Sequence, residues 1–148
     1  MNIEIISSVI SSKYIIKQVS KSYDIGEIIN CELLQSAIND IYRIETTTRN
    51  YILKFYKYNY KDVSEIIFEF EFLSYLKSLD IDVANYIRTI DKNFILEINA
   101  YEGVRYAVLM NLVDGEELDY KINENAYFSG VNNLKFDEND MLPKVSQV

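Results

Sequence analysis

The most constraining feature of this sequence is a long helix-like run that separates two groups of strand-like runs. Residues 62–79 carry apolar side chains at helical spacing, and Asp62 with Glu65 three positions later forms a capping-box-like start. Strand-like runs lie before it at 28–34, 40–46 and 50–56, and after it at 94–98 and 104–113. Short loops between neighbouring runs predict hairpins, so the strands form an antiparallel sheet and the helix covers one of its faces.

The expected fold is therefore of the α+β class, with a five-stranded antiparallel sheet and one covering helix. Residues 1–22 are expected to form an N-terminal helical segment of one or two short helices, because apolar residues recur there at helical spacing. Residues 23–115 are expected to form the sheet lobe. Residues 116–148 are polar and acidic, which predicts a partly ordered tail.

Composition excludes several classes of function. A net charge of −8 over 148 residues argues against nucleic acid and anionic membranes as partners. The chain has no histidine, and Cys31 is its only cysteine, so His-based catalysis, a disulfide framework and a Cys-based zinc site within one chain are not expected. No apolar run approaches the roughly 18 residues of a membrane span, and the N-terminus lacks the pattern of a signal peptide. A cytoplasmic location is expected.

Two opposite charges lie where their neighbours predict burial. Strand alternation places Lys54 on the same face as Ile52 and Tyr56. A helical wheel places Glu69 inside the apolar arc of the helix and Glu71 opposite it. A lysine that faces a covered sheet is costly unless paired, and Glu69 is the partner that the covering helix supplies. The alternative is a lysine that extends to solvent and a solvated glutamate. The predicted arc consists of Val63, Ile66, Ile67, Phe70, Phe72, Leu73 and Leu76.

The order of these motifs resembles the N-terminal lobe of the aminoglycoside phosphotransferase, choline kinase and type II homoserine kinase superfamily, which has a protein-kinase-like fold. The matching stretches are SYDIGEIINCELLQSAINDIYRIETTTRNYILKFY, EFEFLSYL and RYAVLMNLVDGEEL, and residues 23–118 follow the family order. The resemblance implies that Lys54 holds the α- and β-phosphates of a nucleotide and that Glu69 orients Lys54. It also implies that the loop at 35–40 folds over the phosphates, with Ser36 and backbone N–H groups as donors. The alternative for this loop is an ordinary polar hairpin turn.

The stretch MNLV at 110–113 matches the hinge that joins the two lobes of these kinases. The resemblance implies that the Asn111 carbonyl and the Val113 amide meet the adenine edge, and that Ile41, Ile52 and Met110 contact its ring. The same stretch is also interpretable as a buried strand, and both interpretations hold together.

The catalytic motif H-G-D-x-x-x-x-N of these kinases, and their D-F-D-like metal-binding turn, have no match after Gly115. The late acidic cluster of Asp137, Glu138 and Asp140 is interpreted as a solvated tail. No catalytic and no metal-binding residue is therefore predicted. We expect ATP binding to be weak or absent in isolation, and Mg²⁺ to bind only where a C-terminal lobe is supplied.

Three hypotheses follow for the function. The chain is the small lobe of a phosphotransferase-type kinase acting on an alcohol group, inactive alone. Alternatively, it is a non-catalytic protein-interaction or regulatory module built on that lobe. In the third hypothesis it is one half of a split kinase. The partners expected are a nucleotide, a separate large-lobe chain or a second copy in a homodimer.

Overall fold

The computed structural model describes residues 3–112, which belong to one compact unit. Its elements are α1 (Ser12–Ser22), β1 (Ile28–Ser36), β2 (Asn39–Thr46), β3 (Asn50–Tyr56), α2 (Val63–Ser78), β4 (Tyr86–Ile87), β5 (Leu96–Ala100) and β6 (Gly103–Asn111). The expected α+β class is confirmed. Within residues 3–112 the sheet has six strands, whereas five were expected. The additional strand is β4, which was missed because two residues are too few to show an alternating pattern. The expected acidic tail lies outside the described residues.

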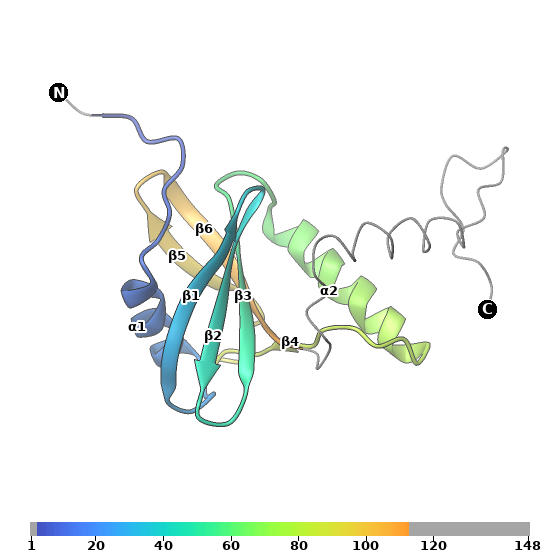
Figure 1. The fold of residues 1–148 in the computed structure, drawn as a ribbon. Coiled ribbons are helices and arrows are strands. Elements are labelled where there is room, and N and C mark those ends of the chain that lie inside the picture. Colours follow the sequence, from blue (N-terminus) through green and yellow to red (C-terminus); the bar gives the residue numbers. More distant parts are fainter. Residues whose placement is uncertain (1–2, 113–148) are drawn as a thin grey trace, which may run out of the picture. The chain divides into compact units, whose positions relative to one another are not determined.

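The strands follow the order β1-β2-β3-β6-β4, and β5 pairs with the other part of the same β6 edge (Figure 1). All neighbouring pairs are antiparallel. The loop between β2 and β3 is closed by the Thr46 hydroxyl, which donates to the Arg49 carbonyl at 2.8 Å. The central strand β3 therefore lies between its hairpin partner β2 and β6, which is distant from it in the sequence.

The two faces of the sheet pack against different helices. Alternate residues of β2 and β3 are buried beneath α1, including Tyr42, Leu53 and Phe55. A smaller cluster of Tyr56, Ile66 and Val108 connects the opposite face to α2. Figure 1 shows the two helices on opposite sides of the sheet. The main core thus lies under α1, and the face toward α2 is left partly open.

The N-terminal helical segment is confirmed only for Ser12–Ser22. The helix begins after Ser11, whose side chain accepts from the Tyr14 amide at 3.3 Å, and it buries Ile15 and Val19. Residues 3–11 are not helical. The Ser8 amide and hydroxyl donate to the two carboxylate oxygens of Glu102 at 3.1 and 2.8 Å. These bonds tie the segment to the β5–β6 turn.

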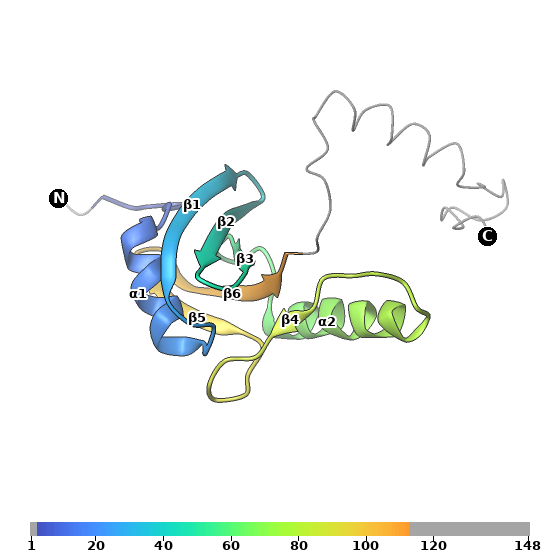
Figure 2. The same cartoon turned by 60° about the horizontal axis from the view of Figure 1, so that its bottom comes forward.

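The boundaries of α2 agree with the sequence prediction, but its buried arc is narrower than expected. The Asp62 side chain accepts from the Glu65 amide at 2.9 Å, which confirms the N-cap. Ile66 is the one buried residue of the helix. Ile67 is 46% exposed and Phe72 52% exposed, so their predicted places on the sheet-facing arc were wrong. Figure 2 shows the reason, since the later turns of α2 extend past the strands.

A buried ion pair connects the start of β2 to β6. The Arg105 guanidinium donates to the Asp40 carboxylate at 2.9 Å, and both side chains are 0% exposed. Arg105 also donates to the carbonyls of Tyr56 and Ser8 at 2.9 and 2.8 Å.

Gly103 packs so closely against Tyr58 that a Cβ added at this glycine would collide with the Tyr58 ring. None of the helices between residues 3 and 112 has the length and apolar character needed to cross a membrane.

Candidate functional site

The two charges that the sequence pairs are brought together by the fold. Lys54 projects from the middle of β3 toward α2, and its Nζ donates to Glu69 Oε2 at 3.4 Å. The two side chains are 22% and 24% exposed, so the pair is shielded but still open to solvent on one side. Glu71, two residues along the helix, is exposed. The predicted ion pair and the solvated Glu71 are confirmed, and the alternative of an unpaired Lys54 is wrong.

Glu69 also binds two groups that the sequence did not identify. The Tyr56 hydroxyl donates to Oε2 at 2.5 Å, and Lys61 forms an ion pair with Oε1. Burial disfavours the charged carboxylate, but the hydrogen bonds from Lys61 and Tyr56 and the charges of both lysines outweigh it, so the pKa of Glu69 is lowered. The pKa of Tyr56 is raised by burial and by its hydrogen bond to Glu69. The carboxylate is therefore ionised at neutral pH and the phenol keeps its proton.

The apolar residues expected to contact adenine surround Lys54 on the sheet face toward α2. Ile41 lies opposite Lys54 across the β2–β3 ladder. Ile52 lies opposite Met110 across the β3–β6 ladder, one residue pair further along the same face. All three side chains are partly exposed. The fold thus produces an apolar strip beside an ammonium group, which is a surface able to hold a flat ring next to an anion.

The hairpin turn at 35–40 shows a different use of Ser36 from the one expected. Its hydroxyl donates to Asp40 Oδ1 at 2.5 Å and accepts from Lys57 Nζ at 3.3 Å. Lys57 also forms an ion pair with Asp40 at 2.8 Å. Because a serine hydroxyl has one proton, Ser36 has none left to donate to a phosphate in this arrangement. Its predicted phosphate contact stays a prediction that requires rotation of the hydroxyl.

At the end of β6, the hinge residues lie beside the segment that enters β4. The Asn111 amide donates to the Asn85 carbonyl at 3.1 Å, and the Asn85 amide donates to the Asn111 side chain at 2.8 Å. These reciprocal bonds join the end of β6 to the residue that precedes β4. Val113 lies outside the described residues, so its predicted adenine contact stays a prediction, as does that of Asn111.

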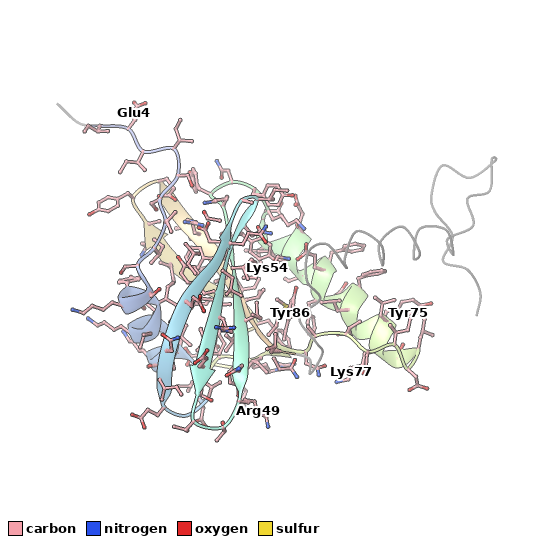
Figure 3. All side chains as sticks on the ribbon, in the orientation of Figure 1. Glu4, Arg49, Lys54, Tyr75, Lys77 and Tyr86 are labelled. Atoms are coloured by element: carbon pink, nitrogen blue, oxygen red, sulfur yellow. The ribbon has the colours of Figure 1, made fainter. Side chains whose placement is uncertain are left out.

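Three features of the site were missed by the sequence analysis. Lys61 lies in the loop before α2, outside the helical pattern, so the helical wheel gave no reason to pair it with Glu69. Tyr56 was placed on the correct face but was given no partner. Tyr86 lies on the unexpected β4, and its pKa is raised by burial and by the charge of Glu69. Figure 3 shows Lys54 and Tyr86 between the sheet and α2, and Tyr75 at the outer end of the helix.

A separate cavity of about 880 Å³ lies against α2 and is not lined by Lys54 or Glu69. Its walls include Ile66 and Phe70 of α2 and Phe94 and Ile95 of the segment before β5. The Phe70 and Phe94 rings stack there with centroids 4.0 Å apart. The candidate site is therefore the open sheet face around Lys54, and this cavity is a distinct feature.

Comparisons with known proteins support the fold and leave the activity open. No protein-family model matches the chain. It is 39% identical over 97 residues to the uncharacterized protein sll1119 of Synechocystis sp., a match that covers 66% of this chain and 27% of that protein. The chain thus spans about a quarter of the curated relative.

Three solved kinases superpose on most of this chain. A microcompartment-associated aminopropanol kinase matches with a TM-score of 0.62 and 23% identity, over 71% of this chain and 33% of its own. An amicoumacin kinase in complex with AMP-PNP and Ca²⁺ matches with a TM-score of 0.64 and 18% identity, over 76% and 34%. A spectinomycin phosphotransferase in complex with ADP and spectinomycin matches with a TM-score of 0.55 and 14% identity, over 72% and 31%.

Each of these matches uses about a third of the kinase chain, which is the share expected for one lobe. The identities are low, so the likeness concerns the fold and not the substrate. The resemblance seen in the sequence is confirmed at this level: the described residues have the small-lobe fold of the phosphotransferase-type kinases.

Proposed function

We propose that this chain is the nucleotide-binding small lobe of a phosphotransferase-type small-molecule kinase. The observation that carries the proposal is the Lys54–Glu69 ion pair on the open sheet face of this fold. Lys54 neutralises the α- and β-phosphate oxygens, and Glu69 fixes the direction of the ammonium group. Ile41, Ile52 and Met110 contact the adenine ring.

The adenine edge is read by the backbone in this proposal, through the Asn111 carbonyl and the Val113 amide. Ser36 joins the phosphate contacts after its hydroxyl turns from Asp40. Phosphoryl transfer to an alcohol requires metal ligands and a group that orients the acceptor. Those groups belong to a C-terminal lobe, which also supplies the Mg²⁺ site, and this chain shows no motif for them after Gly115. We therefore assign nucleotide binding, and no complete reaction, to these residues.

Nuclear magnetic resonance (NMR) titration of the full 148-residue chain with ATP, with and without Mg²⁺, tests the proposal. Binding at millimolar nucleotide is expected to shift the amide signals around Lys54, Ile41 and Met110. Lys54→Ala is expected to weaken ATP binding about tenfold or more, since a charged hydrogen bond to phosphate is lost. Lys17→Ala, an exposed position on α1 across the sheet, is the matched control. Unchanged spectra for the wild type, or equal binding by Lys54→Ala, contradict the proposal.

A second candidate function, a protein-interaction module, is supported by the outer face of α2. Phe68, Phe72 and Tyr75 are 68%, 52% and 59% exposed and lie along one side of the helix. Exposed apolar surfaces of this kind mark sites of association. The partner is a separate large-lobe chain or a second copy of this chain. Light scattering at increasing concentration tests the homodimer, and Phe68→Glu with Phe72→Glu is expected to abolish any association that uses this face.

A further inference from the structure

Glu69 carries one negative charge and is shared by two ammonium groups and one phenol. Lys61 binds Oε1, whereas the Tyr56 hydroxyl and Lys54 both approach Oε2. The carboxylate is thus more than neutralised within this cluster. A positive charge is left on the open face of a chain whose net charge is −8.

The two lysines do not share the carboxylate equally. Lys54 lies 3.4 Å from Oε2, which is longer than the 2.7–2.9 Å of a good charged hydrogen bond. Lys61 forms an ion pair with Oε1, and Tyr56 donates to Oε2 at 2.5 Å. The two lysine side chains are 22% and 24% exposed, so burial does not explain the difference. Lys61 and Tyr56 thus bind one carboxylate oxygen each, and the Lys54 ammonium, which has three donors and one long contact with Glu69, keeps free donors.

We propose that Lys61 is a positioning residue that holds Glu69 and so leaves the Lys54 ammonium available for nucleotide phosphate. This inference rests on the proposed nucleotide-binding function. Without Lys61, the single carboxylate pairs fully with Lys54 and competes with the phosphates for the same ammonium group. With Lys61 in place, Glu69 still directs Lys54 but does not neutralise it.

The test compares ADP with adenosine in NMR titrations of the full chain. Lys61→Met is expected to weaken ADP binding about tenfold, the change that 1.4 kcal/mol produces, and to leave adenosine binding unchanged. Lys61→Arg is expected to restore ADP binding, because it keeps the ion pair with Glu69. Lys17→Met removes the same charge from the opposite side of the sheet and is expected to change neither ligand. A structural defect would weaken both ligands together.

A double-mutant cycle with Glu69→Gln shows whether Lys61 acts through Glu69. In the Glu69→Gln background, Lys61→Met is expected to change ADP affinity less than about twofold, since the competing charge is already gone. A tenfold loss that persists there overturns the positioning role and makes Lys61 a direct phosphate ligand. If Lys61→Met does not give a folded spectrum, Lys61→Gln replaces it, and at least a threefold loss of ADP affinity is expected.

The outcomes separate this inference from the proposed function. ADP binding by the wild type with an unchanged affinity in Lys61→Met overturns the inference and leaves the function standing. A wild type that binds neither ADP nor adenosine overturns the function and the inference together.

Discussion

Replacing Glu69 and Glu71 by alanine, one at a time, tests the arrangement of the candidate site. The two residues lie two positions apart in α2 and undergo the same chemical change, so the gain in helix propensity is common to both variants. Glu69 binds Lys54, Lys61 and Tyr56, whereas Glu71 is exposed. The difference in unfolding free energy between the variants therefore measures the contacts of Glu69.

The magnitude follows from the groups that Glu69 satisfies. Tyr56 is 1% exposed, and leaving its buried hydroxyl without an acceptor costs about 1–3 kcal/mol. The two ion pairs are partly exposed and add about 0.2–1 kcal/mol each after screening by solvent. Glu69→Ala is thus expected to lose about 1.5–5 kcal/mol, whereas Glu71→Ala stays within about 0.5 kcal/mol of the wild type. Glu69→Gln keeps an acceptor for Tyr56 and is expected to fall between them.

The pH dependence of the unfolding free energy tests the charge of Glu69 independently. The pKa of Glu69 in the folded protein lies below its ordinary value of 4.5. Its contribution to stability is therefore fully present above the pKa of the unfolded chain, and it is lost as the pH falls through the folded-state value. The gap between wild type and Glu69→Gln should be constant near neutral pH and should close under acid conditions.

Urea unfolding followed by circular dichroism at several pH values measures both effects. The slope of the unfolding free energy against urea concentration should be the same for the wild type and the three variants, which would show that their native and denatured states are comparable. Equal midpoints for Glu69→Ala and Glu71→Ala would refute the orientation of α2 and the site built on it. A gap that widens on acidification would refute the assigned charge state of Glu69.

Three further predictions concern the scaffold. Arg105→Met should cost about 3–5 kcal/mol in urea unfolding, because it breaks the buried ion pair with Asp40 and removes the donor from the Tyr56 and Ser8 carbonyls. Arg43→Met, which removes a surface ion pair, should cost under about 1 kcal/mol, and equal losses would contradict the buried network. Gly103→Ala should lower the melting temperature more than Gly26→Ala, since both have positive φ but only the first would meet a neighbouring ring. Ile15→Ala should cost about 2–5 kcal/mol in the same unfolding assay, and a loss under about 1 kcal/mol would mean that the core does not lie beneath α1.

Local patterns in the sequence were sufficient to predict most of the sheet and the central ion pair. Strict alternation in β2 and β3 fixes which side chains share a face, because a shift of one residue would exchange the two faces. That alternation placed Lys54 on one face with Ile52 and Tyr56, and helical periodicity directed Glu69 toward the same face. The start of α2 was also predictable from local sequence, because the Asp62 side chain accepts from a backbone amide only three residues away.

What the sequence did not predict depends on long-range contacts. Asp40 and Arg105 are 65 residues apart, and nothing local to either indicates the other. The competition of Lys61 with Lys54 depends on the contact that Lys61, in the loop before α2, makes with Glu69. The error at Phe72 has a different cause: the wheel records which residues are apolar, but the neighbouring strands decide how much of the helix is covered.

The position of α2 depends on a few contacts only, which are the buried Ile66, the Phe70 ring against Tyr86 and Phe94, and the Glu69 cluster, and this links the two candidate functions. Ile66 is its one buried residue, and the Glu69 cluster is a second connection to the sheet. Large apolar side chains of α2 are exposed on its outer side as well as directed toward the sheet, so further protein packed on Phe68 and Phe72 would add stabilisation to that of the inner face. Because Glu69 lies on the same helix, such packing would also fix the carboxylate relative to Lys54. Binding at the outer face and phosphate binding at the sheet would then be coupled, and by linkage each would change the affinity of the other by the same factor.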